Sequence, residues 1–430
     1  MWSKMVLSVF LFFGIAGLSA AASAESAPLM TGFPPPPELR VTTENFMQEP
    51  YNRWAFQHIR ELMPTRDVYR GAAAPVEIPR SPVALEQLEF KLFDGRSLNL
   101  DSWLEQSGAD SFLVLHRGKL VYERYLNGMQ AHTQHQMFSA TKSFIATLAL
   151  ILIDEGQLDA GKQVQAYLPE LAGSAFGDAT VQQILDMTTS ITFSEEYTDR
   201  EADIWKYGYV FSIGGKPPES YAGPRTIYDY LPTLKKSQAP HGEAFHYVTP
   251  NTDVLGWLVS RVSGQSNADM LSERIWQRLG TERDGYFWLE GSGVEMAGGG
   301  LNITARDAAR FGQAVLQHGQ FNGQQIIPKQ VAERILQPGN RALFNVLYED
   351  PWYENVGYAY HDMWWTFNNP HKAVSAIGVH GQFIYIDPVA EMVVVKQSSH
   401  PEAEGESNEV DGPQIWHQIG LHLMALPAPQ

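Results

Sequence analysis

The stretch Phe138-Ser139-Ala140-Thr141-Lys142-Ser143 leads into a strongly apolar helix predicted over residues 143–155. Ser139 and Lys142 are three positions apart, so on a helix their side chains share one face with Cβ atoms about 5–6 Å apart. A serine hydroxyl needs an adjacent base to become a nucleophile, and a lysine can serve if burial lowers its pKa. The apolar run favours such burial, and a helix N-terminus offers unpaired N–H groups to an oxyanion.

Two later segments contain residues that could join this pair. Tyr247 precedes a helix predicted over 251–262, which Thr249 or Asn251 would cap, and its phenol could relay a proton. The competing interpretation is that Tyr247 is a structural tyrosine in the core or at the rim of the cleft. Val379 precedes a strand, and the N–H of this residue or of a neighbour could bind an oxyanion. His380 fits a catalytic role and a hydrogen-bonded turn histidine equally well.

The hydrophobic pattern places strands near both ends of the chain. Residues 112–115 and 120–122 predict a β-hairpin, and residues 381–386 and 392–396 predict two further strands. Helices are predicted between them, including one from 304 to 318, and a last helix over 415–424. The fold class is therefore α/β (α+β), with a Pro-rich arm over 25–85, a sheet domain formed by 86–135 and 301–430, and an inserted helical domain over 136–300.

The N-terminus predicts export. Lys4, an apolar run over 5–20 and Ala22-Ser23-Ala24 resemble a signal peptide cleaved after residue 24, and an N-terminal membrane anchor is the alternative. Cleavage would place the mature protein in a periplasm or in the medium. The chain has no cysteine, which excludes disulfides, a thiol nucleophile and a thiolate metal site.

Composition argues against several kinds of partner. The net charge is −17 without a long Lys/Arg run, so nucleic acid and anionic membranes are not expected. No segment after the signal peptide is apolar enough to cross a bilayer. No cofactor or metal is expected either, because the 13 histidines include no H-E-x-x-H motif and neither His361-Asp362 nor His371 has an evident ligand set. An aromatic cluster over 352–365 predicts either core or the lining of an apolar pocket.

The order and spacing of these segments resemble the serine β-lactamase and penicillin-binding-protein superfamily, in its class C-like branch. The resemblance covers about residues 85–425 and includes 115–122, 154–159, 164–168, 183–190 and 298–312. The 6-aminohexanoate-dimer (nylon-oligomer) hydrolases are similar in addition over the N-terminal arm, 247–257 and 378–382. The resemblance implies a β-lactamase-like fold, with an antiparallel sheet flanked by helices and an inserted, mainly helical domain.

The resemblance also implies roles for the candidate residues. Ser139 would be acylated, Lys142 would be its base, and Tyr247 would shuttle the proton to the leaving group. The oxyanion hole would be formed by the backbone N–H groups of Ser139 and Val379. Tyr197 stands where the nylon-oligomer hydrolases keep a substrate-contacting tyrosine.

Asn251 and His380 are further candidates for substrate binding. The expected substrate is a small amide or ester, and the sequence carries no signal for an oligomeric state. Two alternatives stay open: a β-lactamase or D-Ala-D-Ala carboxypeptidase, and non-catalytic binding of a peptidoglycan-like ligand. Against the first, neither K-T-G nor K-S-G occurs, and Thr249 stands where the Tyr-x-Asn motif has its Asn.

Overall fold

A computed structural model describes residues 28–427. The signal peptide predicted over 1–24 lies outside these residues and stays a prediction. The chain forms two compact units that divide between Arg40 and Val41. The described part of the first contains a 3-10 turn (Pro37–Leu39) followed by Arg40, whose guanidinium donates to the carbonyl of Pro35 over 2.7 Å.

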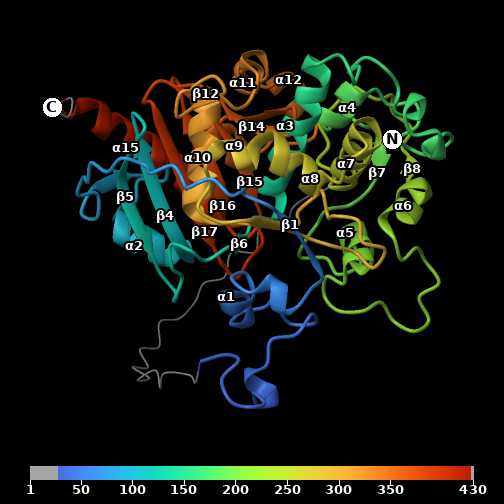
Figure 1. The fold of residues 1–430 in the computed structure, drawn as a ribbon, viewed down its shortest axis with the longest axis horizontal. Coiled ribbons are helices and arrows are strands. Elements are labelled where there is room, and N and C mark those ends of the chain that lie inside the picture. The colour runs from blue at the N-terminus through green and yellow to red at the C-terminus, as the bar shows by residue number, and fades with distance from the viewer. Residues whose placement is uncertain (1–27, 428–430) are drawn as a thin grey trace. The chain divides into compact units, whose positions relative to one another are not determined.

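The second unit is built on a seven-stranded antiparallel sheet with the order β13-β14-β15-β16-β17-β4-β5 (Figure 1). Its strands are β4 (Ala109–His116), β5 (Lys119–Tyr125), β13 (Tyr358–His361), β14 (Trp364–Phe367), β15 (Val374–Gly378), β16 (Gln382–Asp387) and β17 (Met392–Ser398). Sequence-distant segments therefore pair at the centre, where β17 lies against β4.

Helices cover both faces of this sheet. On α10 (Ala305–Leu316), Gly312 approaches so closely that a Cβ there would lie 2.7 Å from Val393 and 3.0 Å from Ile384. On α15 (Asp411–Ala425), the Trp416 ring packs at 4.7 Å from Phe383. Phe383 and Ile384 are consecutive in β16, so they point to opposite faces. The two helices therefore enclose β16 and β17, which explains why every residue of both strands is buried.

A smaller sheet, of order β1-β9-β10-β6, leads to the candidate nucleophile. It comprises β1 (Thr65–Val68), β6 (His135–Gln136), β9 (Gly285–Trp288) and β10 (Leu301–Ile303). The 3-10 turn η3 (Phe138–Ala140) follows β6 directly and runs into α3 (Thr141–Asp154). Twelve consecutive residues of α3 are buried, and this helix packs against α7 (Pro250–Ser263).

The remaining α-helices and strands are short. They are α1 (Tyr51–Ala55), β2 (Glu89–Lys91), β3 (Ser97–Asn99), α2 (Leu100–Gln106), α4 (Val181–Leu185), β7 (Ile191–Thr192), α5 (Asp203–Gly208), α6 (Ile227–Tyr230), β8 (Lys235–Lys236), α8 (Asn267–Leu271), α9 (Gln277–Leu279), β11 (Gln320–Phe321), β12 (Gln324–Gln325), α11 (Lys329–Ile335), α12 (Arg341–Phe344), α13 (Pro351–Val356) and α14 (Glu406–Glu409). Across residues 28–427, no helix combines the length and apolar character needed to span a bilayer.

The expected fold class is confirmed: an antiparallel sheet is flanked by helices, and most of the helical segments come from the middle of the chain. Two details differ from the expectation. The region 136–300 also contains β7, β8 and β9, and β1, from the predicted arm, pairs with β9. The domain boundaries stay a prediction.

Candidate active site

Ser139 lies in a constrained turn rather than on the regular helix that the sequence suggests. Its predecessor Phe138 has φ +44°, a left-handed conformation that costs a non-glycine residue about 1–2 kcal/mol. The Phe138 ring packs edge-on against Phe56 at 4.8 Å and near His380 at 5.3 Å, and these contacts hold the turn. Ser139 stays partly exposed while both neighbours are buried, so its hydroxyl is accessible to a substrate.

Lys142 is the direct partner of Ser139. Its Nζ lies 2.9 Å from Ser139 Oγ and 2.7 Å from the carbonyl oxygen of Gly298, to which it donates. The side chain is almost completely buried, and this burial lowers the pKa of Lys142 to about 8, although the carboxylates of Glu195 and Asp253 oppose the shift. A neutral amine in this place keeps its bond to Gly298 and turns its lone pair toward the serine hydroxyl.

Asp253, which the sequence analysis did not single out, supports this arrangement from α7. Its Oδ2 accepts the Tyr207 hydroxyl at 2.8 Å, and its Oδ1 accepts the Gly298 N–H at 3.3 Å. Gly298 therefore connects the Lys142 amine, through its carbonyl oxygen, to the Asp253 carboxylate, through its N–H. A Cβ at Gly298 would lie 2.6 Å from the Thr249 methyl, so a glycine here lets the two segments pack closely. Burial raises the pKa of Asp253 to about 7.

Tyr247 lies on the loop before α7, with its ring centroid 5.1 Å from Lys142 Nζ. Burial and the negative charge of Glu195 raise the pKa of Tyr247 well above 10, and a hydrogen bond with Ser139 opposes the rise. The phenol therefore keeps its proton at neutral pH. The structure brings Ser139, Lys142 and Tyr247 together as the sequence predicts.

An aromatic wall stands beside Tyr247. The Trp365 ring lies 5.6 Å from it and the Tyr360 ring 6.1 Å, while the Tyr348 hydroxyl accepts the Tyr247 backbone N–H at 3.3 Å. Within the aromatic cluster predicted over 352–365, Tyr358, Tyr360 and Trp364 are buried, whereas Trp365 is partly exposed. The cluster therefore combines core packing with an apolar surface next to Tyr247.

Glu195 is a second carboxylate that the sequence analysis missed. It accepts the Thr249 hydroxyl at 2.5 Å, the Thr249 N–H at 2.8 Å and the Tyr197 hydroxyl at 2.7 Å. Burial raises its pKa, and the positive charge of Lys142 opposes the rise. Through these bonds, Glu195 attaches the loop that contains Tyr197 to Thr249, at the start of α7. No sequence signal identifies it, because Thr249 and Lys142 lie in other segments of the chain.

The end of β15 closely approaches the turn that carries Ser139. A Cβ on Gly378 would lie 2.2 Å from the Met137 carbonyl oxygen and 3.1 Å from Ser139 N, so only glycine fits. Val379 follows Gly378 at the strand end. Among residues 28–427, no backbone hydrogen bond outside helices and strands is donated by Ser139 or Val379. Both N–H groups are therefore candidates for a hydrogen bond to a substrate oxygen.

The two remaining candidates are held by protein contacts. Asn251 is fully buried on α7, and its Oδ1 accepts the Thr189 hydroxyl at 2.9 Å. His380 is 3 % exposed behind Phe138, with Nδ1 2.8 Å from the His400 carbonyl oxygen. Its burial lowers the pKa of His380 to about 4. The substrate contacts expected of both side chains stay predictions.

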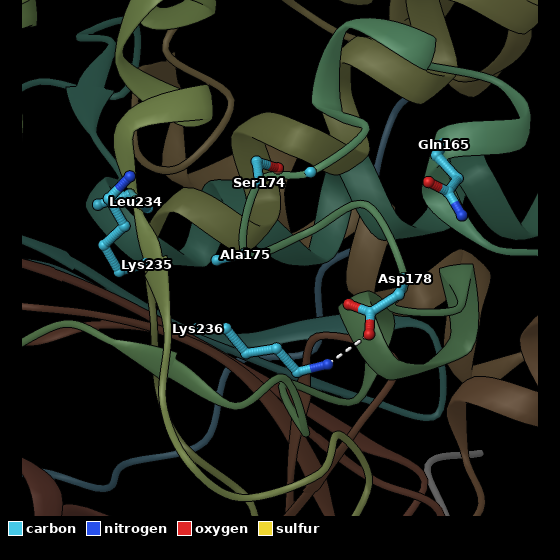
Figure 2. Close-up of a pocket in the computed structure, with 8 residues that line it drawn as sticks. Gln165, Ser174, Ala175, Asp178, Leu234, Lys235 and Lys236 are labelled. Atoms are coloured by element: carbon cyan, nitrogen blue, oxygen red, sulfur yellow. Dashed lines mark hydrogen bonds and ion pairs between the residues drawn. The ribbon is translucent and has the colours of Figure 1, made fainter.

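A surface cavity of about 300 Å³ is separate from this cluster (Figure 2). It is lined by Gln165, Gly173, Ser174, Ala175, Asp178, Leu234, Lys235 and Lys236, and Lys236 is paired with Asp178. None of the candidate catalytic residues lines it.

Among the described residues, His371, Asp387 and His417 form a group that could hold a metal ion. These residues are not part of the Ser139 cluster.

Comparison with known proteins supports the relationship that the geometry suggests. The sequence model of the Beta-lactamase family matches residues 100–411. The chain is 35% identical over 365 residues to the 6-aminohexanoate-dimer hydrolase of Paenarthrobacter ureafaciens, covering 84% of this chain and 89% of that protein.

Solved structures agree. A Bacillus anthracis protein named for 6-aminohexanoate-dimer hydrolase superimposes with a TM-score of 0.81 at 32% identity, over 90% of this chain and 98% of that one. EstCE1, a hydrolase with promiscuous acyltransferase activity, shares the fold at 16% identity and a TM-score of 0.57, over 73% of this chain and 96% of that one. The chain therefore belongs to the β-lactamase family and is one of its serine hydrolases.

Proposed function

We propose that the protein hydrolyses a small amide or ester through an acyl-enzyme on Ser139. Lys142 acts as the base, Tyr247 as the proton shuttle, and the N–H groups of Ser139 and Val379 as the oxyanion hole. The observation that carries this proposal is the 2.9 Å contact between Ser139 Oγ and a desolvated lysine amine. Such a pair has little structural reason to exist, because burying an amine is costly unless its neutral form is used.

In the acylation step, neutral Lys142 takes the Ser139 hydroxyl proton while Oγ bonds to the substrate carbonyl carbon. The carbonyl oxygen becomes an oxyanion and accepts the two backbone N–H groups. When the C–N or C–O bond breaks, Tyr247 gives its proton to the leaving amine or alcohol and recovers one from the Lys142 ammonium. The acyl group is then left on Ser139 and Lys142 is neutral again.

Deacylation uses the same groups in reverse order. As the water oxygen adds to the acyl carbon, Tyr247 takes a proton from water and passes its own phenol proton to neutral Lys142. The second tetrahedral intermediate uses the same oxyanion hole. Collapse returns the proton to Ser139 Oγ and releases the acid, so the enzyme is restored without a net change.

The substrate class follows from the aromatic wall and from the relatives. An apolar surface next to Tyr247 suits an aliphatic chain, and the curated relative is named for the 6-aminohexanoate dimer, a linear amide. We therefore propose short linear amides of this kind, together with aliphatic esters, as substrates.

The direct test combines turnover with active-site labelling. Mature protein from Glu25 is assayed with short p-nitrophenyl esters and the 6-aminohexanoate dimer, and is treated with a serine-reactive phosphonate followed by mass spectrometry. We expect one label per chain and turnover in the wild type, and neither in Ser139→Ala. Ser143→Ala is the matched control, because Ser143 lies one turn on and its buried hydroxyl donates to Met363. Labelling and turnover that persist in Ser139→Ala would refute the proposal.

Two further measurements on the same purified protein distinguish the alternative functions. A β-lactamase or D-Ala-D-Ala carboxypeptidase would form a covalent penicillin adduct on Ser139 that mass spectrometry detects. A non-catalytic receptor would bind ligands without turnover, and Lys142→Ala would leave its function intact. We expect no efficient β-lactam turnover, since the K-T-G motif that recognises the β-lactam carboxylate in this superfamily is absent.

A further inference from the structure

Three residues from separate elements meet at the end of the main sheet that lies away from Ser139. His371 is in the loop between β14 and β15, Asp387 ends β16, and His417 is on α15. One potential ligand atom of each lies within 4.8 Å of the other two. Gly378, at the other end of β15, approaches Ser139, so the length of this strand alone separates the two places by roughly 13 Å.

The contacts leave ligand atoms facing one another. Asp387 Oδ1 accepts the backbone N–H groups of Val389 and Ala390, at 3.1 and 2.9 Å, and Oδ2 lies 2.7 Å from His371 Nδ1. His371 is 6% exposed and Asp387 is completely buried. Asp387 Oδ2 and His371 Nδ1 are thus held in place by their contact with each other and by the backbone bonds to Asp387 Oδ1.

His417 supplies an independent indication. Its Nδ1 is buried and has no hydrogen-bond partner among the described residues, although its ring lies 4.4 Å from that of His371. A buried nitrogen without a partner is costly and needs a physical reason. One turn further along α15, a Cβ on Gly420 would lie 3.3 Å from Asp387 Oδ2, so a glycine there lets the helix approach the carboxylate.

We propose that His371, Asp387 and His417 bind a divalent transition-metal ion, Zn²⁺ by preference, which joins α15 to the β14–β15 loop. Two imidazoles and one carboxylate suit Zn²⁺ and its first-row neighbours, whereas Ca²⁺ and Mg²⁺ prefer sets of oxygen ligands. Ligands of a tetrahedral zinc lie about 3.3 Å apart. A small outward movement of His371 and Asp387 therefore admits the ion in place of the proton that they share, and water takes the fourth position.

The inference goes beyond the proposed hydrolase function and does not depend on it. The chain has no cysteine and hence no disulfide, and such an ion would cross-link the sheet to the last helix. The sequence gives little sign of the site, because its three residues are far apart in the chain and belong to different elements.

The test is metal binding by the tag-free mature protein after treatment with EDTA. Isothermal titration with ZnCl₂ is compared between wild type, His417→Ala and His422→Ala, and Co²⁺ absorption spectra report the coordination geometry. His422→Ala is the matched control, since it removes a histidine from the same helix outside the cluster. We expect one Zn²⁺ per chain in wild type and His422→Ala, affinity at least about tenfold weaker in His417→Ala, and a higher melting temperature with zinc.

Two results would overturn the proposal: wild type and His417→Ala that titrate identically, or a wild type that binds no stoichiometric zinc. If His417→Ala does not fold by circular dichroism, His417→Gln replaces it, because glutamine keeps a side chain in the space without an imidazole. Ester turnover is measured in parallel. Because zinc binding is read separately, a failure of the hydrolase proposal is distinguishable from a failure of the metal site.

Discussion

The protonation state of Lys142 controls the chemistry that we propose. Burial lowers its pKa to about 8, and only the neutral amine can accept the Ser139 proton. We therefore expect kcat/KM for ester hydrolysis to rise with pH as Lys142 loses its proton, to reach half its maximum near pH 8 and to level off about one pH unit higher. An unshifted lysine would instead titrate at about 10.4.

Stopped-flow measurement of acylation across this range, corrected for spontaneous hydrolysis, checks the prediction. A rate that keeps climbing up to about pH 10 would show that Lys142 is not a depressed base.

Glu195 should set the position of this pH profile. Its negative charge raises the pKa of Lys142 and so works against burial. In Glu195→Gln the charge is gone, so the ammonium is less favoured and the profile should move to lower pH, by on the order of one unit. Loss of its hydrogen bonds to Thr249 alone would reduce the rate at every pH without moving the midpoint, which is the result that would contradict the electrostatic role.

Tyr247 can be tested through the leaving group. An amide nitrogen must be protonated to depart, whereas p-nitrophenolate leaves readily without a proton. Tyr247→Phe keeps the ring beside Lys142 and removes the hydroxyl, so we expect the acylation rate to fall about 10²–10⁴-fold with an amide and much less with an aryl ester. Single-turnover kinetics with both substrates measure acylation apart from deacylation, in which the phenol takes part whichever substrate is used. An equal loss of acylation rate on both would mean that the phenol does not protonate the leaving group.

Residues whose roles depend on local spacing could be predicted from sequence. Ser139 and Lys142 are three positions apart, and the apolar helix behind them implied a buried amine. Glu195 and Asp253 could not be found in this way. Each lies in a stretch with no distinguishing pattern, and their link to Lys142 exists only after folding brings three separate segments together.

At the level of elements, we expect the strand end at Gly378 to determine whether the proposed oxyanion hole can form. A Cβ there would lie 2.2 Å from the Met137 carbonyl oxygen, so β15 must shift away from the nucleophile turn. We expect Gly378→Ala to lower kcat about 10²–10³-fold, the loss typical of a removed oxyanion donor. Gly291→Ala is the control, because a Cβ there meets nothing within 4 Å. Kinetics together with melting curves separate the effects, and an active Gly378→Ala would refute the assignment of Val379.

Elements with strong local patterns were predicted well. The hairpin expected over 112–122 is β4 and β5, and the helix expected over 251–262 is α7, Pro250–Ser263. The strand order could not be predicted from residue patterns. β17 pairs with β4, a strand far away in the sequence, and local periodicity carries no information on such a pairing. The Phe138 turn was missed for a related reason. Its left-handed backbone is imposed by packing against Phe56 and His380, not by a turn residue.

At the scale of the whole molecule, stability must come from packing and hydrogen bonds, since no disulfide is possible. The two helices that enclose β16 and β17 bury aromatic and branched side chains on both faces of the sheet, as the Trp416 and Val393 contacts illustrate. Burial on this scale is the dominant favourable contribution to folding. The fold of such a chain depends little on the redox state of its surroundings.

Export itself is the remaining prediction. The basic start, short apolar run and small-residue exit of the first 24 residues predict cleavage by a signal peptidase, so the full-length chain produced in a Gram-negative host should reach the periplasm with Glu25 as its first residue. Intact-mass analysis of the periplasmic fraction measures this directly. A chain that starts at residue 25 without the leader should stay in the cytosol and have the same kcat/KM, because every residue of the proposed site lies beyond position 135. Membrane-bound protein that keeps residues 1–24 would instead show that the segment is an anchor, since an uncleaved apolar run remains in the bilayer.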